Sequence, residues 1–396
     1  MIARAIQKAG STSAPRGKTD AVSDFPFARP SEADPTTSDA EIFEGCDAFR
    51  DAAKSWAVLE QQRGAATPFL THAVASACAA AHMKRGAVPR IVIVKEGGKP
   101  RLIFPSVITK TFGISVVRFL GDPLIQYGDV LVSPEVRQAD IARALAIVAA
   151  PEVASLAIFR RVRDDAAIAP TLGTIVEGGS FEESPLIDLA APSRLSSRDV
   201  REQRRQHKRL AECGTVAFQV LRSQHAEPVL RHALELKRTW LAEHGHQSAV
   251  LGSADWEQAV NAICLAPNSP MVVALLTCAG KPAAIEIALV NDSCWFSFLG
   301  AFAPEYSKFG AGSVLTEHCM RWARDQGLSQ FDQLPPAQQY KRRHASHSVS
   351  VRDYALPLRL AGNLPLTIGL MAPSAKWFLS KMPEGARSAL LKAAGY

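Results

Sequence analysis

Residues 301–343 read AFAPEYSKFGAGSVLTEHCMRWARDQGLSQFDQLPPAQQYKRR, and this stretch decides the fold of the second half of the chain. An aromatic run at 294–300 comes directly before it and predicts a strand. A Gly-Ala-Gly turn follows at 310–312, and apolar residues then recur at helical spacing over 312–326. The sequence therefore predicts a strand, a glycine-rich turn and a helix in immediate succession.

The glycine-rich turn has the properties of a phosphate-binding loop. Small residues let backbone N–H groups approach one anion closely, and the N-terminus of the following helix adds partial positive charge. A dinucleotide-binding loop follows a strand in a βαβ unit, and a nucleotide P-loop ends in Gly-Lys-Ser/Thr, so neither context fits. The residues predicted to bind the anion are Lys308, Gly310, Ala311, Gly312 and Ser313.

The order of predicted elements occurs twice along the chain. In the second half it comprises helices at 226–244 and 255–265, strands at 271–278, 281–290 and 294–300, a helix at 312–326 and a strand at 329–334. In the first half it comprises a helix at 46–63, a second helix after Pro68, strands at 90–95, 100–108 and 113–120, a helix at 136–149 and a strand at 153–159. No residue-level repeat accompanies this order, so the duplication is architectural.

The order of antiparallel meander, glycine-rich loop, helix and strand resembles the acyl-CoA site of GNAT-superfamily N-acetyltransferases. Several phrases over residues 40–355 are similar to the CelD/BcsL-type acetyltransferases of cellulose biosynthesis. These phrases are Thr67-Pro68-Phe69, Gly121-Asp122-Pro123, Tyr127-Gly128-Asp129, the segment 201–214, Pro304-Glu305-Tyr306, Phe331-Asp332 and Tyr340-Lys341.

The resemblance implies an α/β (α+β) fold of tandem acetyltransferase-like domains with mixed, mainly antiparallel sheets, as in the related FemABX aminoacyl transferases. We expect a degenerate acetyltransferase-like domain at 39–192 and the acyl-CoA-binding domain at 193–357. Residues 358–396 are predicted to form a helical appendage. Residues 1–38 are rich in Ser, Thr and Pro without an apolar period, which predicts a disordered tail.

Acyl transfer from a thioester to an amine needs a deprotonated nucleophile, a stabilised oxyanion and a proton for the departing thiolate. Glu286, in the middle strand of the meander, is a candidate base or an outward-facing strand residue. Asp332 ends the strand after the helix, where it is predicted to orient the amine or to act as the base. Tyr340 is a candidate proton donor to the thiolate, or a packing residue.

The chain departs from the family pattern at two places. The general acetyltransferase loop has Arg or Gln three residues before its first glycine, and this position is Ser307 here, with Lys308 beside it. Family members usually have a glycine and an acidic residue before the Tyr-Lys pair, where this chain has LPPAQQ at 334–339. The expected co-substrate is acetyl-CoA or another acyl-CoA, and no metal is expected because His and Cys lack ligand spacing.

The net charge of +7 is concentrated in one segment, where seven Lys or Arg lie within residues 194–209. Such a run is typical of a solvated helix face, a nucleic-acid backbone site, an anionic membrane surface or a site for a polyanionic cofactor. No aromatic residue interleaves the run, which disfavours nucleic acid. The seven cysteines include no CxxC pair, which predicts reduced thiols and a cytoplasmic protein. No apolar run reaches the ~18 residues that span a bilayer.

Two other functions stay open alongside the acyl-CoA-dependent one. The basic segment 194–209 also suits a FemABX-like aminoacyl transferase that uses charged tRNA, although the compact glycine turn favours CoA. An inactive domain that serves as an interaction module of a polysaccharide-export assembly is the third. The expected partners are acyl-CoA, an unidentified acceptor and, loosely, a polysaccharide-synthesis assembly.

Overall fold

The computed structural model describes residues 39–63, 67–111, 113–175, 179, 181–192, 195–246, 248–359 and 385. The tail predicted at 1–38 lies outside these residues, as does the appendage predicted at 358–396 apart from residues 358, 359 and 385. None of the described helices is long and apolar enough to cross a membrane.

The first half of the chain packs two helices on one face of a meander. The pattern of the sequence did not reveal its edge strand, which pairs with the first strand of the meander. Trp56 and Leu59 on the first helix are fully buried against the meander residues Ile91 and Ile103. These elements are β1 (Asp39–Glu44), α1 (Ala48–Arg63), η1 (Pro68–Leu70), α2 (His72–Lys84), β2 (Val88–Glu96), β3 (Lys99–Thr111) and β4 (Ile114–Phe119).

A helix then returns the chain to a strand that runs parallel to β4. The helix is amphipathic, with Ile141, Ala144, Leu145 and Val148 buried. The parallel pair joins Val116–Arg118 to Leu156–Ile158. The elements concerned are β5 (Leu131–Val132), which pairs with β3, α3 (Gln138–Val148), β6 (Leu156–Arg163) and α4 (Ala169–Ile175).

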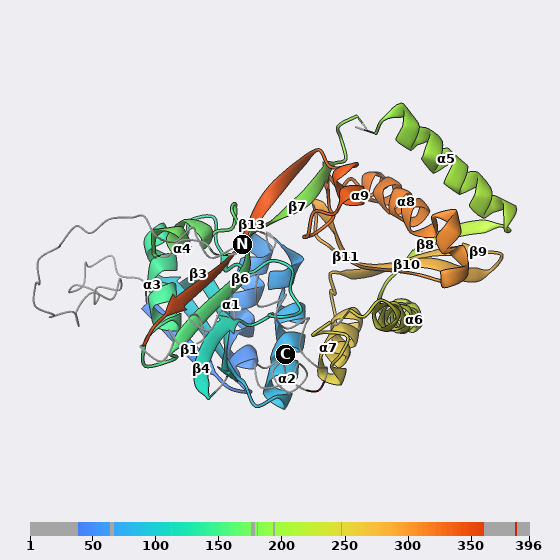
Figure 1. The fold of residues 1–396 in the computed structure, drawn as a ribbon. Coiled ribbons are helices and arrows are strands. Elements are labelled where there is room, and N and C mark those ends of the chain that lie inside the picture. Colours follow the sequence, from blue (N-terminus) through green and yellow to red (C-terminus); the bar gives the residue numbers. More distant parts are fainter. Residues whose placement is uncertain are drawn as a thin grey trace, which may run out of the picture. The chain divides into compact units, whose positions relative to one another are not determined.

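The second half repeats this arrangement. Its strands at Met271–Cys278 and Lys281–Val290 have the bounds predicted from the sequence. Figure 1 shows α5 and α8 on one face of the strands β8–β11 and α6 and α7 on the other. The elements are α5 (Ser197–Glu212), β8 (Val216–Leu221), α6 (Ser223–Glu243), α7 (Ala254–Leu265), β9 (Met271–Cys278), β10 (Lys281–Val290), β11 (Cys294–Phe302), η2 (Pro304–Phe309), α8 (Ala311–Asp325), β12 (Gln330–Asp332) and α9 (Gln339–Arg342).

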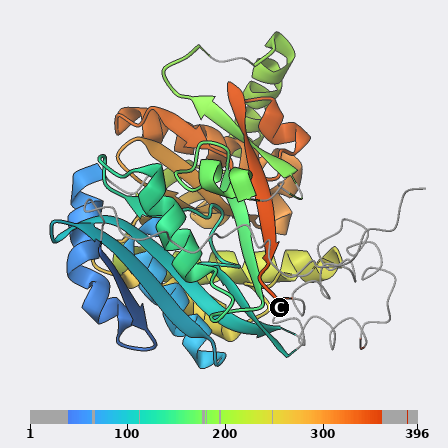
Figure 2. The same ribbon diagram turned by 90° about the vertical axis from the view of Figure 1, so that its left-hand side faces the viewer.

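The two halves exchange their last strands, which joins them in one sheet. The strand β7 (Phe181–Asp188) follows α4 in sequence, yet it pairs with β12 of the second half. The strand β13 (His347–Pro357) follows α9, yet it pairs with β6 of the first half. Figure 2 shows β13, in red, running beside the green strands β6 and β7. The sheet order is β1-β2-β3-β4-β6-β13-β7-β12-β11-β10-β9-β8.

The duplicated order predicted from the sequence is confirmed by this topology. Among the described strands only two pairs are parallel, β4 with β6 and β11 with β12, and each encloses one helix in sequence. Each half also has its own core cluster, one around Trp56 and one around Trp295. Because the exchanged strands cross the predicted boundary between 192 and 193, the exact division into domains stays a prediction.

Candidate functional site

The glycine turn lies where the sequence analysis predicted it, between η2 and α8. Gly310 has φ of 71°, in the left-handed region that residues other than glycine adopt at a cost, and its carbonyl accepts the N–H of Val314. No side chain caps α8, and in the described part of the chain the N–H groups of Ala311, Gly312 and Ser313 have no acceptor. The helix therefore presents three free donors and its positive dipole end at one point.

The space around the turn is open on one side and lined by α5 on the other. A methyl group added at Gly312 meets nothing closer than Phe302 Cδ1, at 3.8 Å. A methyl group added at Gly310 lies 2.6 Å from Cδ of Gln206, which belongs to α5. Two cations flank the adjoining ring of Phe309, with Lys308 Nζ at 5.0 Å and Arg209 Cζ at 5.4 Å from its centroid. The turn is thus positively charged and accessible at Gly312.

The strands β11 and β12 part at the end of the sheet that faces this turn. They pair only from Cys294 to Phe296, opposite Gln330–Asp332, while β11 continues to Phe302. Just beyond Phe296, the register of β11 against β10 shifts by one residue, so that Phe298 has no partner residue on β10. A bulge re-aims a strand and ends its pairing. The backbone of β11 beyond Phe296 is therefore released from β12 on the side that leads to Gly310.

Glu286 is buried beside this opening, on β10. Its Oε1 accepts hydrogen bonds from Trp295 Nε1, at 2.8 Å, and from the Ser297 hydroxyl, both on β11. Burial raises the pKa of Glu286, while the two hydrogen bonds and the charge of Lys341 lower it in part. A carboxyl group with a raised pKa binds a proton more readily than an exposed one, which is a property of catalytic bases.

Tyr340 and Lys341 come to the same region from α9. Tyr340 is 59% exposed. Partial desolvation of its ring raises the pKa of Tyr340, and the charge of Glu286 adds to this effect. Lys341 Nζ donates to the Leu334 carbonyl at 2.7 Å, and burial lowers the pKa of Lys341 to about 8. Of the three residues predicted to be catalytic, Glu286 and Tyr340 thus interact electrostatically with each other.

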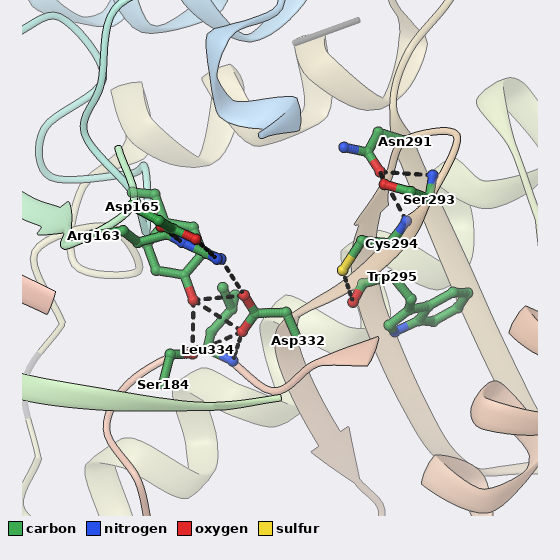
Figure 3. A network of polar contacts seen from close by, with 10 residues as sticks. Arg163, Asp165, Ser184, Asn291, Ser293, Cys294, Trp295, Asp332 and Leu334 are labelled. Atoms are coloured by element: carbon green, nitrogen blue, oxygen red, sulfur yellow. Dashed lines mark hydrogen bonds and ion pairs between the residues drawn. The ribbon is translucent and has the colours of Figure 1, made fainter. Parts of the chain in front are cut away.

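Asp332 has a different environment, since it is fully buried and saturated with donors. It accepts hydrogen bonds from the hydroxyls of Tyr127 and Ser184, each at 2.7 Å, from Arg163 Nη1 at 3.1 Å and from the Leu334 N–H at 2.8 Å. Figure 3 shows Arg163, Ser184 and Leu334 converging on this carboxylate. Burial raises the pKa of Asp332, and Arg163 is the strongest of the groups that lower it.

Three partners of Asp332 were missed in the sequence analysis as functional residues. Arg163 ends β6 and Ser184 lies on β7, while Tyr127 entered only as part of a family phrase. The one available signal was the presence of three arginines, Arg160, Arg161 and Arg163, in the second half of an otherwise apolar strand, LAIFRRVR. A buried strand cation usually has a buried partner, but its identity depends on strand pairing.

The first half also contributes an aromatic side chain to the opening. The Phe69 ring, from η1, lies 6.0 Å from that of Phe296 and 6.5 Å from that of Phe298. The Tyr127 ring lies 6.0 Å from that of Phe69 and 6.3 Å from that of Phe296. Side chains from both halves therefore border the place where β11 leaves β12.

Comparisons with known proteins agree with this geometry. Residues 197–342 match the family model of the acetyltransferase (GNAT) domain. No curated protein matches the chain. FemX has a similar structure, with a TM-score of 0.57 and 12% identity over 83% of this chain and 99% of FemX.

Two further solved structures are similar over almost their whole length. The C-terminal domain assigned to a lysylphosphatidylglycerol synthetase of Agrobacterium fabrum has a TM-score of 0.53 and 13% identity, over 82% of this chain and 98% of that domain. L-PGS from Bacillus licheniformis has a TM-score of 0.53 and 12% identity, over 80% of this chain and 96% of that chain. The second half thus matches the GNAT acetyltransferase domain, and the predicted fold class of tandem acetyltransferase-like halves is confirmed.

Proposed function

We propose that this protein is an acyltransferase that moves an acetyl or longer acyl group from acyl-CoA to an amine or a hydroxyl acceptor. The observation that carries the proposal is the uncapped N-terminus of α8 behind Gly310, beside the point where β11 leaves β12. The diphosphate of CoA would accept the free N–H groups of Ala311, Gly312 and Ser313, with Lys308 as a nearby cation. The thioester would then lie along the unpaired part of β11.

The reacting groups have a consistent assignment in this arrangement. Glu286 would accept the proton of the attacking amine, directly or through a water, since burial has raised its pKa. Tyr340 would give a proton to the departing thiolate. The oxygens of Asp332 already accept hydrogen bonds from four donors, so Asp332 would have a structural role. It would fix the strands at the closed end of the opening between β11 and β12.

Calorimetric titration with acetyl-CoA tests the proposal. Gly312→Glu places a carboxylate in open space at the helix N-terminus, so the protein folds while the CoA diphosphate is repelled. We expect affinity to fall by at least about tenfold, a difference of about 1.4 kcal/mol. Gly173→Glu is the matched control, because Gly173 also has open space and lies on α4. Equal affinity of all three proteins would contradict the proposal.

A FemX-like aminoacyl transfer from charged tRNA is the second candidate. The observation in its favour is the similarity of fold to FemX and to the lysylphosphatidylglycerol synthetase domain over nearly the whole of each. The two candidates differ in the donor, so a parallel titration with aminoacyl-tRNA separates them. Binding of acetyl-CoA at micromolar concentration without tRNA binding supports CoA, and the reverse result supports tRNA.

The link to exopolysaccharide or cellulose biosynthesis, and the cytoplasmic location, rest on the sequence. The first depends on the phrases shared with the CelD/BcsL-type family, and the second on the cysteine pattern. All seven cysteines are unpaired, and only Cys46 and Cys213 are exposed. Incubation of the protein with acetyl-CoA and amino sugars, followed by mass spectrometry of the sugars, tests the acceptor class.

A further inference from the structure

The helix α5 carries a row of cations on its outer face. The cations are Arg198, Arg201, Arg204, Arg205 and Lys208, and all five are exposed. At 100° per residue they fall within one sector of about 120°, and they extend over about 15 Å of the helix. We name this set the basic stripe.

The basic stripe is opposite the side of α5 that packs on the protein. Leu210 is fully buried, Gln206 lies against Gly310, and His207 bonds to Glu317 of α8. Figure 1 shows α5 lying outside α8. These inward residues fix the rotation of the helix, so the stripe faces away from the sheet.

Few acidic groups neutralise the stripe. Arg205 pairs with Glu202 at 2.9 Å, whereas no carboxylate of the described residues lies within ion-pairing distance of Arg198, Arg201, Arg204 or Lys208. Glu202 lies on the flank of the helix and Asp199 on its inward face, both outside the sector of about 120°. Four like charges kept together without partners are mutually repulsive, and an external polyanion would relieve this repulsion.

The geometry of the stripe distinguishes between classes of polyanion. A helix that enters a nucleic-acid groove has phosphates along both flanks, whereas the cations of α5 occupy one sector that a plane can touch. Single-stranded nucleic acid is bound with stacking aromatics, and α5 has no aromatic residue. No large apolar side chain of α5 is exposed either, so a planar partner would be contacted through charge and without insertion.

We propose that the basic stripe of α5 docks the protein on an anionic lipid surface. Each Lys or Arg near such a surface contributes about 1 kcal/mol, which makes a stripe of this size a reversible, salt-sensitive contact. Because Gln206 lies against Gly310 on the opposite side of α5, docking would leave the glycine turn behind this helix, about one helix diameter (~10 Å) from the lipid headgroups. The contact is independent of the identity of the acyl donor.

Sedimentation of the full-length protein with vesicles tests this proposal. The vesicles contain phosphatidylcholine alone or with about one third phosphatidylglycerol, an amount that gives a strongly negative surface. The test variant carries R198Q, R201Q, R204Q and K208Q. The control variant removes four exposed cations elsewhere, with K54Q, K99Q, K110Q and R222Q. Circular dichroism verifies that both variants are folded.

We expect binding only to the anionic vesicles, with an affinity that falls at least about a hundredfold in the test variant and much less in the control. Raising the salt from 0.05 M to 0.5 M should release the protein, since surface charges are screened. Absence of binding to anionic vesicles, or equal losses in the two variants, would overturn the proposal. So would tighter binding to a duplex RNA than to vesicles, lost in the test variant, because the stripe would then serve nucleic acid.

Discussion

The hydroxyl of Tyr127 donates a hydrogen bond of 2.7 Å to Oδ2 of Asp332, across 205 positions of the sequence. Tyr127 follows the meander of the first half, and Asp332 ends β12 of the second. Ser184 on β7 and Arg163 on β6 donate to the same carboxylate. These residues meet because β7 and β13 are exchanged between the halves. The buried cluster around Asp332 therefore connects the two halves where β11 and β12 begin to part.

Removal of the Tyr127 hydroxyl should therefore weaken the fold. Tyr127→Phe takes one donor from a buried carboxylate, and we expect the free energy of unfolding to fall by about 1.5–3 kcal/mol. Tyr354→Phe is the matched control, because Tyr354 is buried but its hydroxyl makes no hydrogen bond to the described residues. Urea unfolding measures both, and similar losses in the two variants would show that the hydrogen bond contributes nothing.

The free energy of unfolding should depend on pH through the titration of Asp129. Its carboxylate accepts the N–H groups of Ala167 and Ile168, yet burial is the larger effect and raises the pKa of Asp129 from 3.8 to about 6. A raised pKa in the folded state means that the contribution to stability is complete below pH 3.8 and is lost as the pH rises through about 6. The loss is about 3 kcal/mol.

Asp129→Asn should abolish this part of the pH dependence. The difference in free energy of unfolding between wild type and variant is measured at pH 4, 5, 6 and 7. We expect the difference to change by about 2.4 kcal/mol over this range, with the wild type losing stability relative to the variant. A difference that is constant with pH would mean that Asp129 titrates normally.

The sequence predicted the order of the elements well, since the second-half meander has strong alternation and clear turns. It did not predict the strands β7 and β13. Phe181–Asp188 carries Glu182, Glu183 and Pro185, and His347–Pro357 has several polar residues, so neither has the pattern of a buried strand. Their place in the sheet comes from pairing with each other and with strands far away in sequence.

The candidate site was predictable to a similar extent. Local sequence places Gly310 and Gly312 at the start of a helix, because a turn and a helix N-terminus are local features. The cluster around Asp332 joins residues from β6, β7 and the segment after β4, and no local pattern contains that information. Asp332 consequently looked like a free carboxylate at a strand end, whereas its oxygens have four donors.

Glu286 and Asp332 should respond in opposite ways to neutral substitution. Glu286→Gln keeps an oxygen that can accept from Trp295 and Ser297, so the fold should survive, while acyl transfer falls about 10²–10⁴-fold. Asp332→Asn replaces one accepting oxygen with an NH2 group that faces hydrogen-bond donors. We expect this to lower the free energy of unfolding by about 1–3 kcal/mol or more. Thermal unfolding and thiol release from acetyl-CoA with an amine panel measure both variants.

The acid limb of the pH–rate profile gives a second check on Glu286. Because burial raises the pKa of Glu286, the base should become active only above pH 4.5. The limb should disappear in Glu286→Gln. An unchanged pH–rate profile in that variant, or full activity, would show that Glu286 is not the base. Its hydrogen bonds to Trp295 and Ser297 would then serve the fold alone.

The first half should bind no acyl-CoA, because its counterpart of the glycine turn is closed. The segment that follows β4 is filled by the buried side chains of Leu124, Ile125 and Tyr127. A methyl group added at Gly128 would lie 2.3 Å from Phe119 Cδ2, so no space remains for a ligand.

The helix that follows this segment is also closed to anions. The Asp140 carboxylate accepts the backbone N–H of Arg137, at 3.1 Å, and pairs with the Arg137 guanidinium, with Nε at 3.0 Å, so an internal ion pair occupies the N-terminus of α3. A phosphate at this position would meet a carboxylate, whereas at α8 it meets free N–H groups. We therefore predict one acyl-CoA per chain, bound by the second half.

Titration with a non-hydrolysable acetyl-CoA analogue should give a stoichiometry near one. Hydrogen-exchange protection on binding should concentrate at residues 296–318, which include the unpaired part of β11 and the start of α8, and should spare 119–132. Gly312→Glu should abolish the protection at 296–318 while Gly173→Glu leaves it intact. A stoichiometry of two, or protection centred on 119–132, would show that the first half also binds the donor, and the division of work between the halves would be wrong.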